Sequence, residues 1–186
     1  TSDYYAKCFM ASDQLRNCYS NEDQRWNGYL CPYGEAGDEK KSSKFARELK
    51  FGACLRLSEA YLNRAEAYAN LAKIGGNEYF GKALSDLNTI REKRIKNYAS
   101  QAWTNSTFNN NADNLIENCR EERRREFCFE GMRWFDLRRY GMQSFSHRLD
   151  ESTNPGDEHS VEIGTATPKW MLPIMQHHKE SNPALN

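Results

Sequence analysis

The chain has 186 residues, a length typical of one domain, and 38% of them are hydrophobic, which is enough for a core at this length. Its 26 basic and 26 acidic residues balance, so the charge favours neither nucleic acid nor an anionic membrane as a partner. No apolar run is long enough to span a bilayer, and no secretion signal opens the sequence. Because the chain starts at Thr1, we expect it to be a fragment of a longer protein.

Residues 1–50 are expected to form an amphipathic lead-in and a variable loop region. A short amphipathic piece covers about residues 2–18, and a polar segment with Asn27-Gly28 and Pro32 follows it. Because glycine, asparagine and proline favour turns, we interpret this second segment as loop.

A pair of helices is predicted for residues 51–96. Apolar and small residues recur at helical spacing over 51–73, Gly75-Gly76 ends that helix, and a second helix covers about 78–96. The short connection predicts an antiparallel hairpin, and its small-then-large pattern is typical of a tetratricopeptide unit. Since one such unit cannot bury its own apolar face, we expect a helix at 116–125 to cover it.

The segment that follows the hairpin, residues 97–113, is rich in Asn, Ser and Thr and is predicted to be a surface loop. Residues 114–141 then show the pattern of two helical pieces. Gly131 separates the pieces, and Gly141 marks the end of the second one.

The tail, residues 142–186, is expected to be polar and irregular at first and extended later. Extended chain is predicted around 161–163 and 170–172, because Pro168 and Pro173 argue against helix there.

The predicted helix at 114–130 carries charged residues on its apolar stripe. Arginine is tolerated on such a packing face when carboxylates meet its guanidinium group. We therefore expect an ion-paired clasp in which the arginines are Arg123 and Arg124 and the candidate carboxylates are Glu59, Glu66, Glu122 and Glu126.

Four motifs carry a resemblance to a known family. They are the charged and aromatic run at 121–141, the helix motif at 55–67, the element at 83–91, and the closing Leu172-Pro173-Ile174 with Asn182-Pro183. In this order they resemble the motifs of the SusD/RagB family, the nutrient-binding lipoproteins of the Bacteroidetes outer membrane.

The resemblance implies an all-α fold: a tetratricopeptide-like helical hairpin scaffold with long irregular loops, in which residues 51–186 form the SusD/RagB C-terminal domain. It also implies a non-catalytic protein that binds a glycan at the cell surface and delivers it to a SusC-like TonB-dependent transporter. Membrane contact would occur only through a lipid anchor upstream of this chain, and nucleic acid is not an expected partner.

The acidic residues of the 121–130 run do not predict an enzyme. A glycosidase needs two carboxylates that face each other across a sugar, whereas carboxylates one helical turn apart lie side by side and pair with neighbouring arginines. His177-His178 and Asp157-Glu158-His159 lack the spacing of a metal site, so neither a metal nor a cofactor is expected.

Six cysteines occur at positions 8, 18, 31, 54, 119 and 128, without a CxxC pair. Cys54, Cys119 and Cys128 lie in apolar helical contexts, which favours buried free thiols over disulfides.

Four loop aromatics are the candidates for ligand binding, because proteins hold neutral sugars against an aromatic ring and bind the hydroxyl groups around its edge. They lie among Asn, Gln, Arg and Asp, and they are Trp26, Tyr29, Tyr33 and Trp103. The plainer interpretation is that these rings cap the helical core from outside.

A helical protein- or peptide-binding module remains the alternative, including a SusD-like protein whose ligand is a peptide. Such an adaptor should present several repeats and a groove lined by Asn, Lys and Arg. Only one hairpin is visible in the sequence.

Overall fold

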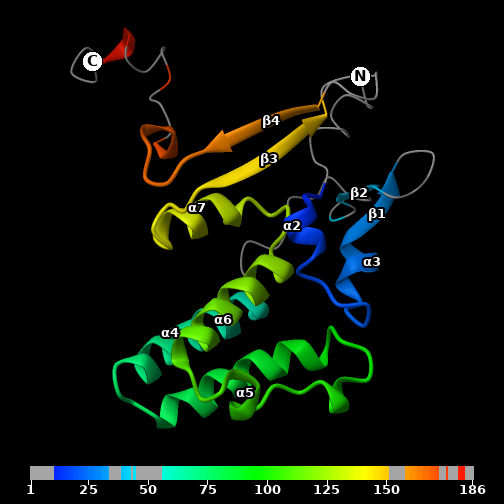
Figure 1. Ribbon diagram of the computed structural model, residues 1–186, viewed down its shortest axis with the longest axis vertical. Helices are drawn as coiled ribbons and strands as arrows, with labels where there is room; N and C mark the ends of the chain where they lie inside the picture. The colour runs from blue at the N-terminus through cyan, green and yellow to red at the C-terminus, as the bar shows by residue number, and fades with distance from the viewer. Residues whose placement is uncertain are drawn as a thin grey trace. The chain divides into compact units, whose positions relative to one another are not determined.

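The computed structural model describes residues 11–33, 39–42, 44, 56–150, 158–171, 175 and 180–182 (Figure 1). The chain divides between Arg133 and Trp134 into two compact units, which are described separately below. The domain boundary predicted near residue 50 falls among residues outside the described part, so it stays a prediction.

The lead-in of the first unit contains two short helices and a hairpin. Helix α2 (Asp13–Arg16) begins where Ser12 accepts a hydrogen bond from the Leu15 amide, and helix α3 (Arg25–Tyr29) follows it. Strand β1 (Leu30–Tyr33) then pairs antiparallel with β2 (Glu39–Ser42).

The prediction of loop at Asn27-Gly28 and Pro32 is therefore wrong. Asn27-Gly28 lies inside α3, whose start is fixed when the Gln24 amide donates to the carbonyl of Arg94, 2.8 Å away. A contact with a distant segment thus overrides the local turn preference. Pro32 fits β1 because this sheet has two strands, and an edge strand tolerates a missing amide donor.

Helices α4 (Leu57–Lys73) and α5 (Glu78–Glu92) form the predicted antiparallel hairpin. Gly75 has a φ of +115°, the left-handed conformation that ends many helices. Small residues line the contact between the two helices and are completely buried; they are Ala65, Ala69 and Ala83. Their size lets the helices approach closely, as the tetratricopeptide-like pattern predicted.

Helix α6 (Ala112–Glu126) packs against α4 and completes the core of the first unit. The side chain of Asn111 caps the start of α6 by accepting hydrogen bonds from the backbone amides of Asp113 and Asn114. The predicted break between the two helical pieces is present, but α6 ends at Glu126, five residues before the predicted position at Gly131. Gly131, with a φ of +75°, then leads into α7 (Met132–Arg139), and Gly141 follows that helix with a φ of +96°.

Between α5 and α6 the chain runs back along α5, as the lower part of Figure 1 shows. The predicted surface loop contains two short 3-10 helices, η1 (Tyr98–Ser100) and η2 (Asn105–Phe108). Phe108 turns inward and belongs to the hydrophobic core.

The second unit contains an antiparallel hairpin of β3 (Phe145–Asp150) and β4 (Glu158–Ile163), followed by the 3-10 helix η3 (Pro168–Trp170). Extended chain at 161–163 is thus confirmed, whereas extended chain at Trp170 is wrong. Pro168 begins η3, since the first position of a helix needs no amide donor. Trp170 is completely buried and packs against Trp134, with ring centroids 4.9 Å apart.

The helical hairpin scaffold is confirmed, and the description all-α omits the two short β-hairpins. Among the described residues, no helix has both the length and the apolar character needed to cross a membrane.

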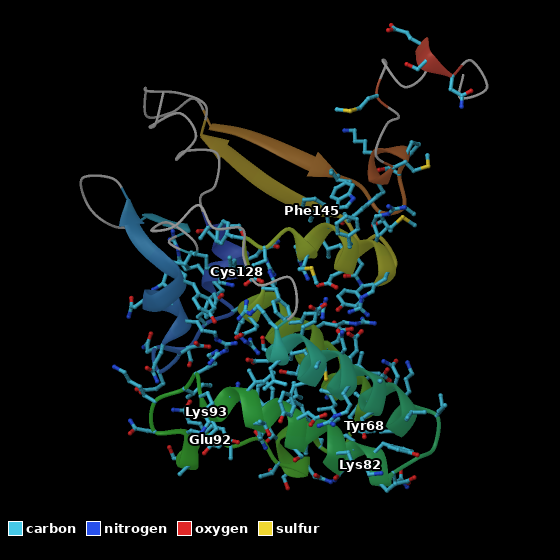
Figure 2. The ribbon with its side chains drawn as sticks, turned by 180° about the vertical axis from the view of Figure 1, so that it is seen from behind. Tyr68, Lys82, Glu92, Lys93, Cys128 and Phe145 are labelled. Atoms are coloured by element: carbon cyan, nitrogen blue, oxygen red, sulfur yellow. The ribbon has the colours of Figure 1, made fainter. Side chains whose placement is uncertain are left out.

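An aromatic pair closes the turn end of the helical hairpin. The rings of Tyr68 on α4 and Tyr79 on α5 stack with centroids 5.6 Å apart, and the ammonium group of Lys82 lies 4.6 Å from the Tyr79 centroid. Figure 2 shows Tyr68 and Lys82 close together near the turn between α4 and α5. Tyr79 lies directly over Gly76, where an added Cβ would be 2.5 Å from its Cδ2 atom.

Gly76→Ala should therefore displace the Tyr79 ring and lower the free energy of unfolding by about 1–3 kcal/mol, the usual cost of overpacking. Gly81→Ala is the matched control, because a Cβ at this α5 position meets no atom within 4 Å. Alanine is the better helix former, so this second change should stabilise by about 0.5–1 kcal/mol. Urea unfolding of both variants measures the difference, and equal effects would contradict the close packing at Gly76.

Candidate functional site

Two glutamates on the last turns of α6 form the charged centre of the first unit. Glu122 and Glu126 lie one helical turn apart, and both side chains are 0% exposed. A buried carboxylate is strongly unfavourable unless cations and hydrogen-bond donors surround it. The arrangement of arginines around these two groups therefore defines the site.

Glu126 receives three arginines from three different segments. Its Oε1 accepts hydrogen bonds from Nη2 of Arg56 at 2.7 Å and from Nη2 of Arg94 at 2.9 Å. Its Oε2 accepts from Nε of Arg94 at 3.0 Å and from Nη1 of Arg25 at 3.2 Å. One carboxylate thus joins α3, the start of α4 and the end of α5.

Glu122 is held by a second set of guanidinium groups. Its Oε1 lies 2.7 Å from Nη1 of Arg25, and its Oε2 accepts from Nη2 of Arg125 at 2.9 Å. Arg91 approaches the same carboxylate to 3.7 Å. Arg25 also donates to both carboxylate oxygens of Asp23, so this guanidinium group bridges three acidic side chains.

The surrounding arginines determine the protonation state of Glu122 and Glu126. Burial alone would raise the pKa of Glu122, but the facing Arg25 and Arg125 outweigh burial and lower it to about 2. The pKa of Glu126 is likewise lowered, because its hydrogen bonds with Arg94 and the charges of the neighbouring arginines outweigh burial. Both groups are ionised near neutral pH, so neither can donate a proton as a general acid.

This geometry separates the cluster from the carboxylate pair of a glycosidase. There, two carboxylates flank a space that admits the scissile bond, and one of them carries a proton. Glu122 and Glu126 instead share Arg25, which fills the space that a substrate would need. The arrangement can hold chain segments together, and it offers no acid and base pair.

The residues predicted for the ion-paired clasp are arranged differently from the prediction. Arg123 lies 3.9 Å from Glu59 and donates to Oδ1 of Asn63 at 2.7 Å. Arg120 is the arginine nearest Glu66, at 4.0 Å. Arg124 is half-buried, and within the described part of the chain it forms no ion pair with Glu66.

Helix α4 thus meets α6 along the face that holds Arg120 and Arg123, and not through Arg124. The prediction also missed Arg25, Arg56 and Arg94, which come from segments far away in sequence. The local pattern of α6 indicated that Glu122 and Glu126 need cations, but it held no signal for which arginines supply them.

One of the four aromatic candidates, Tyr29, contacts this cluster, and Trp26 packs in the small apolar cluster of the lead-in. The Tyr29 ring lies under the ammonium group of Lys44, 4.0 Å from its centroid, and its hydroxyl group reaches Glu126 at 3.5 Å. Trp26 is half-buried and packs against Tyr19, with centroids 5.7 Å apart. Tyr33 lies in β1, and its side chain is outside the described part. A ligand-binding role for these three residues stays a prediction.

Trp103, the fourth candidate, lies between η1 and η2 on a different part of the unit. Its ring stacks on the guanidinium group of Arg91, 3.5 Å from the ring centroid, and meets Phe108 edge to face at 5.3 Å. Burial lowers the pKa of Arg91, although Glu122 partly compensates. Trp103 is half-buried, so the ring both covers the core and remains partly accessible.

Metal ligands and thiols give no further site in the described residues. No group of three or more His, Cys, Asp or Glu side chains lies close enough there to hold a metal ion. Cys18, Cys119 and Cys128 are free thiols. Burial raises the pKa of Cys119 and of Cys128, which keeps both thiols protonated and unreactive.

Removing one buried charge should destabilise the first unit strongly. Glu122→Gln leaves Arg25 and Arg125 short of a counter-charge, so we expect the free energy of unfolding to fall by about 3–5 kcal/mol. Glu121→Gln is the control, because Glu121 is 56% exposed and its contact with Arg125 is 3.4 Å. That change should cost at most about 1 kcal/mol. Chemical denaturation compares the two, and similar losses would contradict the ionic cluster.

The lowered pKa of Glu122 also predicts how stability depends on pH. The ordinary pKa is 4.5 and the folded value is about 2, so folding is favoured by deprotonation. The stabilisation is complete above about pH 4.5 and is lost as the pH falls through about 2. Urea unfolding between pH 7 and pH 3 should show this loss, and Glu122→Gln should reduce its slope. An unchanged slope in the variant would refute the assignment.

Comparison with known proteins identifies the family. A search of curated proteins found no match, whereas the family model described as the SusD family matches residues 4–186. SusD proteins form a non-catalytic binding family with a tetratricopeptide-like helical fold, which agrees with the predictions of a helical scaffold and of no enzyme activity. They are lipoproteins of the outer-membrane surface, and they take part in glycan uptake with SusC-like transporters. Because the match covers nearly the whole sequence, the chain belongs to the SusD family.

Proposed function

We propose that the full-length protein binds an oligo- or polysaccharide at the outer face of the outer membrane and delivers it to a SusC-like TonB-dependent transporter. Membership of the SusD family is the observation that carries this proposal, because the match extends over residues 4–186. A lipid anchor upstream of this chain would hold the protein at the membrane.

The chemistry of the buried cluster supports binding rather than turnover. Its two central carboxylates are ionised and surrounded by arginines, so they hold segments of the chain together. A scaffold of this kind suits a protein that presents a ligand surface without changing the ligand. The proposal therefore places glycan contacts on side chains outside the cluster.

Titration of the full-length protein with a panel of polysaccharides tests the proposal. We expect saturable binding of at least one glycan, no release of new reducing ends during prolonged incubation, and copurification of a TonB-dependent transporter from outer membranes. Calorimetry, a reducing-sugar assay and mass spectrometry give the three measurements.

Two results would contradict the proposal. Tight binding of peptides with no binding of any saccharide would favour the alternative of a helical peptide-binding module. Cleavage of a bound polysaccharide would show catalysis, and it would overturn the non-catalytic assignment.

A further inference from the structure

The segment between α5 and α6 has an unusual composition for an exposed part of this protein. Residues 97–111 contain no charged side chain, although 28% of the whole chain is charged. Amide and hydroxyl side chains dominate the segment, and Trp103 lies near its middle. Groups of this kind bind the hydroxyl groups of neutral sugars, whereas an acidic sugar also requires a cation.

The segment is held in a defined conformation despite its irregular path. Asn97 and Asn109 have φ values of 53° and 50°, which asparagine accepts more readily than most residues. Thr104 and Thr107 form a capping box at the start of η2. Asn88 on α5 accepts from the Trp103 amide at 3.0 Å and donates to the Trp103 carbonyl at 2.7 Å.

The Trp103 ring packs against two buried side chains, Arg91 and Phe108. Arg91 is only 7% exposed, and its guanidinium group lies 3.5 Å from the ring centroid. Phe108 restrains the same ring at 5.3 Å with the two planes nearly perpendicular. A half-buried ring with its backbone and one face fixed retains little freedom to lose when a ligand binds.

Free polar groups lie beside this ring in the sequence. Asn105 and Ser106 begin η2, whose Phe108 touches Trp103, and both side chains are exposed. Within the described residues, neither side chain makes a hydrogen bond. They can therefore donate to and accept from sugar hydroxyl groups without losing an internal partner.

We infer that Trp103, Asn105 and Ser106 form a contact surface for a neutral sugar unit of the bound glycan. The inference rests on the proposed function and adds the charge class of the ligand and the place where one unit binds. The exposed part of the Trp103 ring contacts the apolar side of the sugar. The side chains of Asn105 and Ser106 bind its hydroxyl groups.

Two variants of the full-length protein test this surface, with a neutral polysaccharide and a uronic acid polysaccharide as probes. The double variant Asn105→Ala with Ser106→Ala should weaken binding of the neutral probe by about three- to tenfold, since it removes one or two hydrogen bonds. Trp103→Ala should weaken it by about tenfold or more, while Trp103→Phe should retain most of the affinity.

The double variant distinguishes a binding role of this surface from a purely structural role of Trp103. Its two residues are exposed and make no internal side-chain hydrogen bond among the described residues, so its melting temperature should equal that of the natural protein. Ser85→Ala, at an exposed position on α5, is the matched control; it should leave affinity unchanged and should not lower stability, because alanine is the better helix former.

The outcomes separate the inference from the proposed function. If the natural protein binds a neutral glycan and the double variant binds it equally well, the surface is overturned while the function stands. Binding of the uronic acid polysaccharide alone would overturn the neutral class. If the natural protein binds no glycan, both the surface and the proposed function fail.

Discussion

The carboxylate of Glu126 is the group on which the arrangement of the first unit depends. It is completely buried, and its charge is stable only because Arg25, Arg56 and Arg94 reach it together from three segments. If one of these three segments moved away, its arginine and Glu126 would lose their contact while the carboxylate stayed buried, which is unfavourable. The ionic contacts therefore tie the formation of α3 and of the α4–α5 hairpin to the end of α6.

The lead-in depends on this coupling more than the hairpin does. The hairpin and α6 share a large apolar core, whereas among the described residues only four buried apolar side chains lie beneath the lead-in: Ala11, Leu15, Leu30 and Cys128. Apolar burial is not directional, so a small cluster fixes orientation poorly. The bidentate contacts of Arg25 with Asp23 are directional, and backbone hydrogen bonds at Gln24 and Lys96 add further restraints.

The two kinds of interaction explain what the sequence could predict. Helical periodicity and glycines at helix ends are local signals. The helical hairpin, the end of α4 at Gly75 and the break between α6 and α7 at Gly131 were therefore all predictable. Ion pairs join residues far apart in sequence, and the eight arginines and glutamates of α6 offer many equivalent partners. Local pattern thus indicated that α6 needs counter-charges, but only packing decides that Arg120, and not Arg124, faces Glu66. The same reason accounts for α3, where a contact with Arg94 prevails over the turn preference of Asn27-Gly28.

Arg91 links the buried charges to the half-buried ring of Trp103. Its guanidinium group lies 3.7 Å from Glu122 on one side and stacks on Trp103 on the other. The negative charge of Glu122 therefore holds Arg91 in place, and Arg91 in turn holds the ring. A ring that is fixed before a ligand arrives loses little conformational entropy on binding, so in the inferred sugar surface the ion cluster would contribute to affinity without touching the ligand. In the inferred sugar surface, α6 therefore both holds the scaffold together and supports the Trp103 ring, whereas the exposed side chains of Asn105 and Ser106 can be changed without disturbing the core.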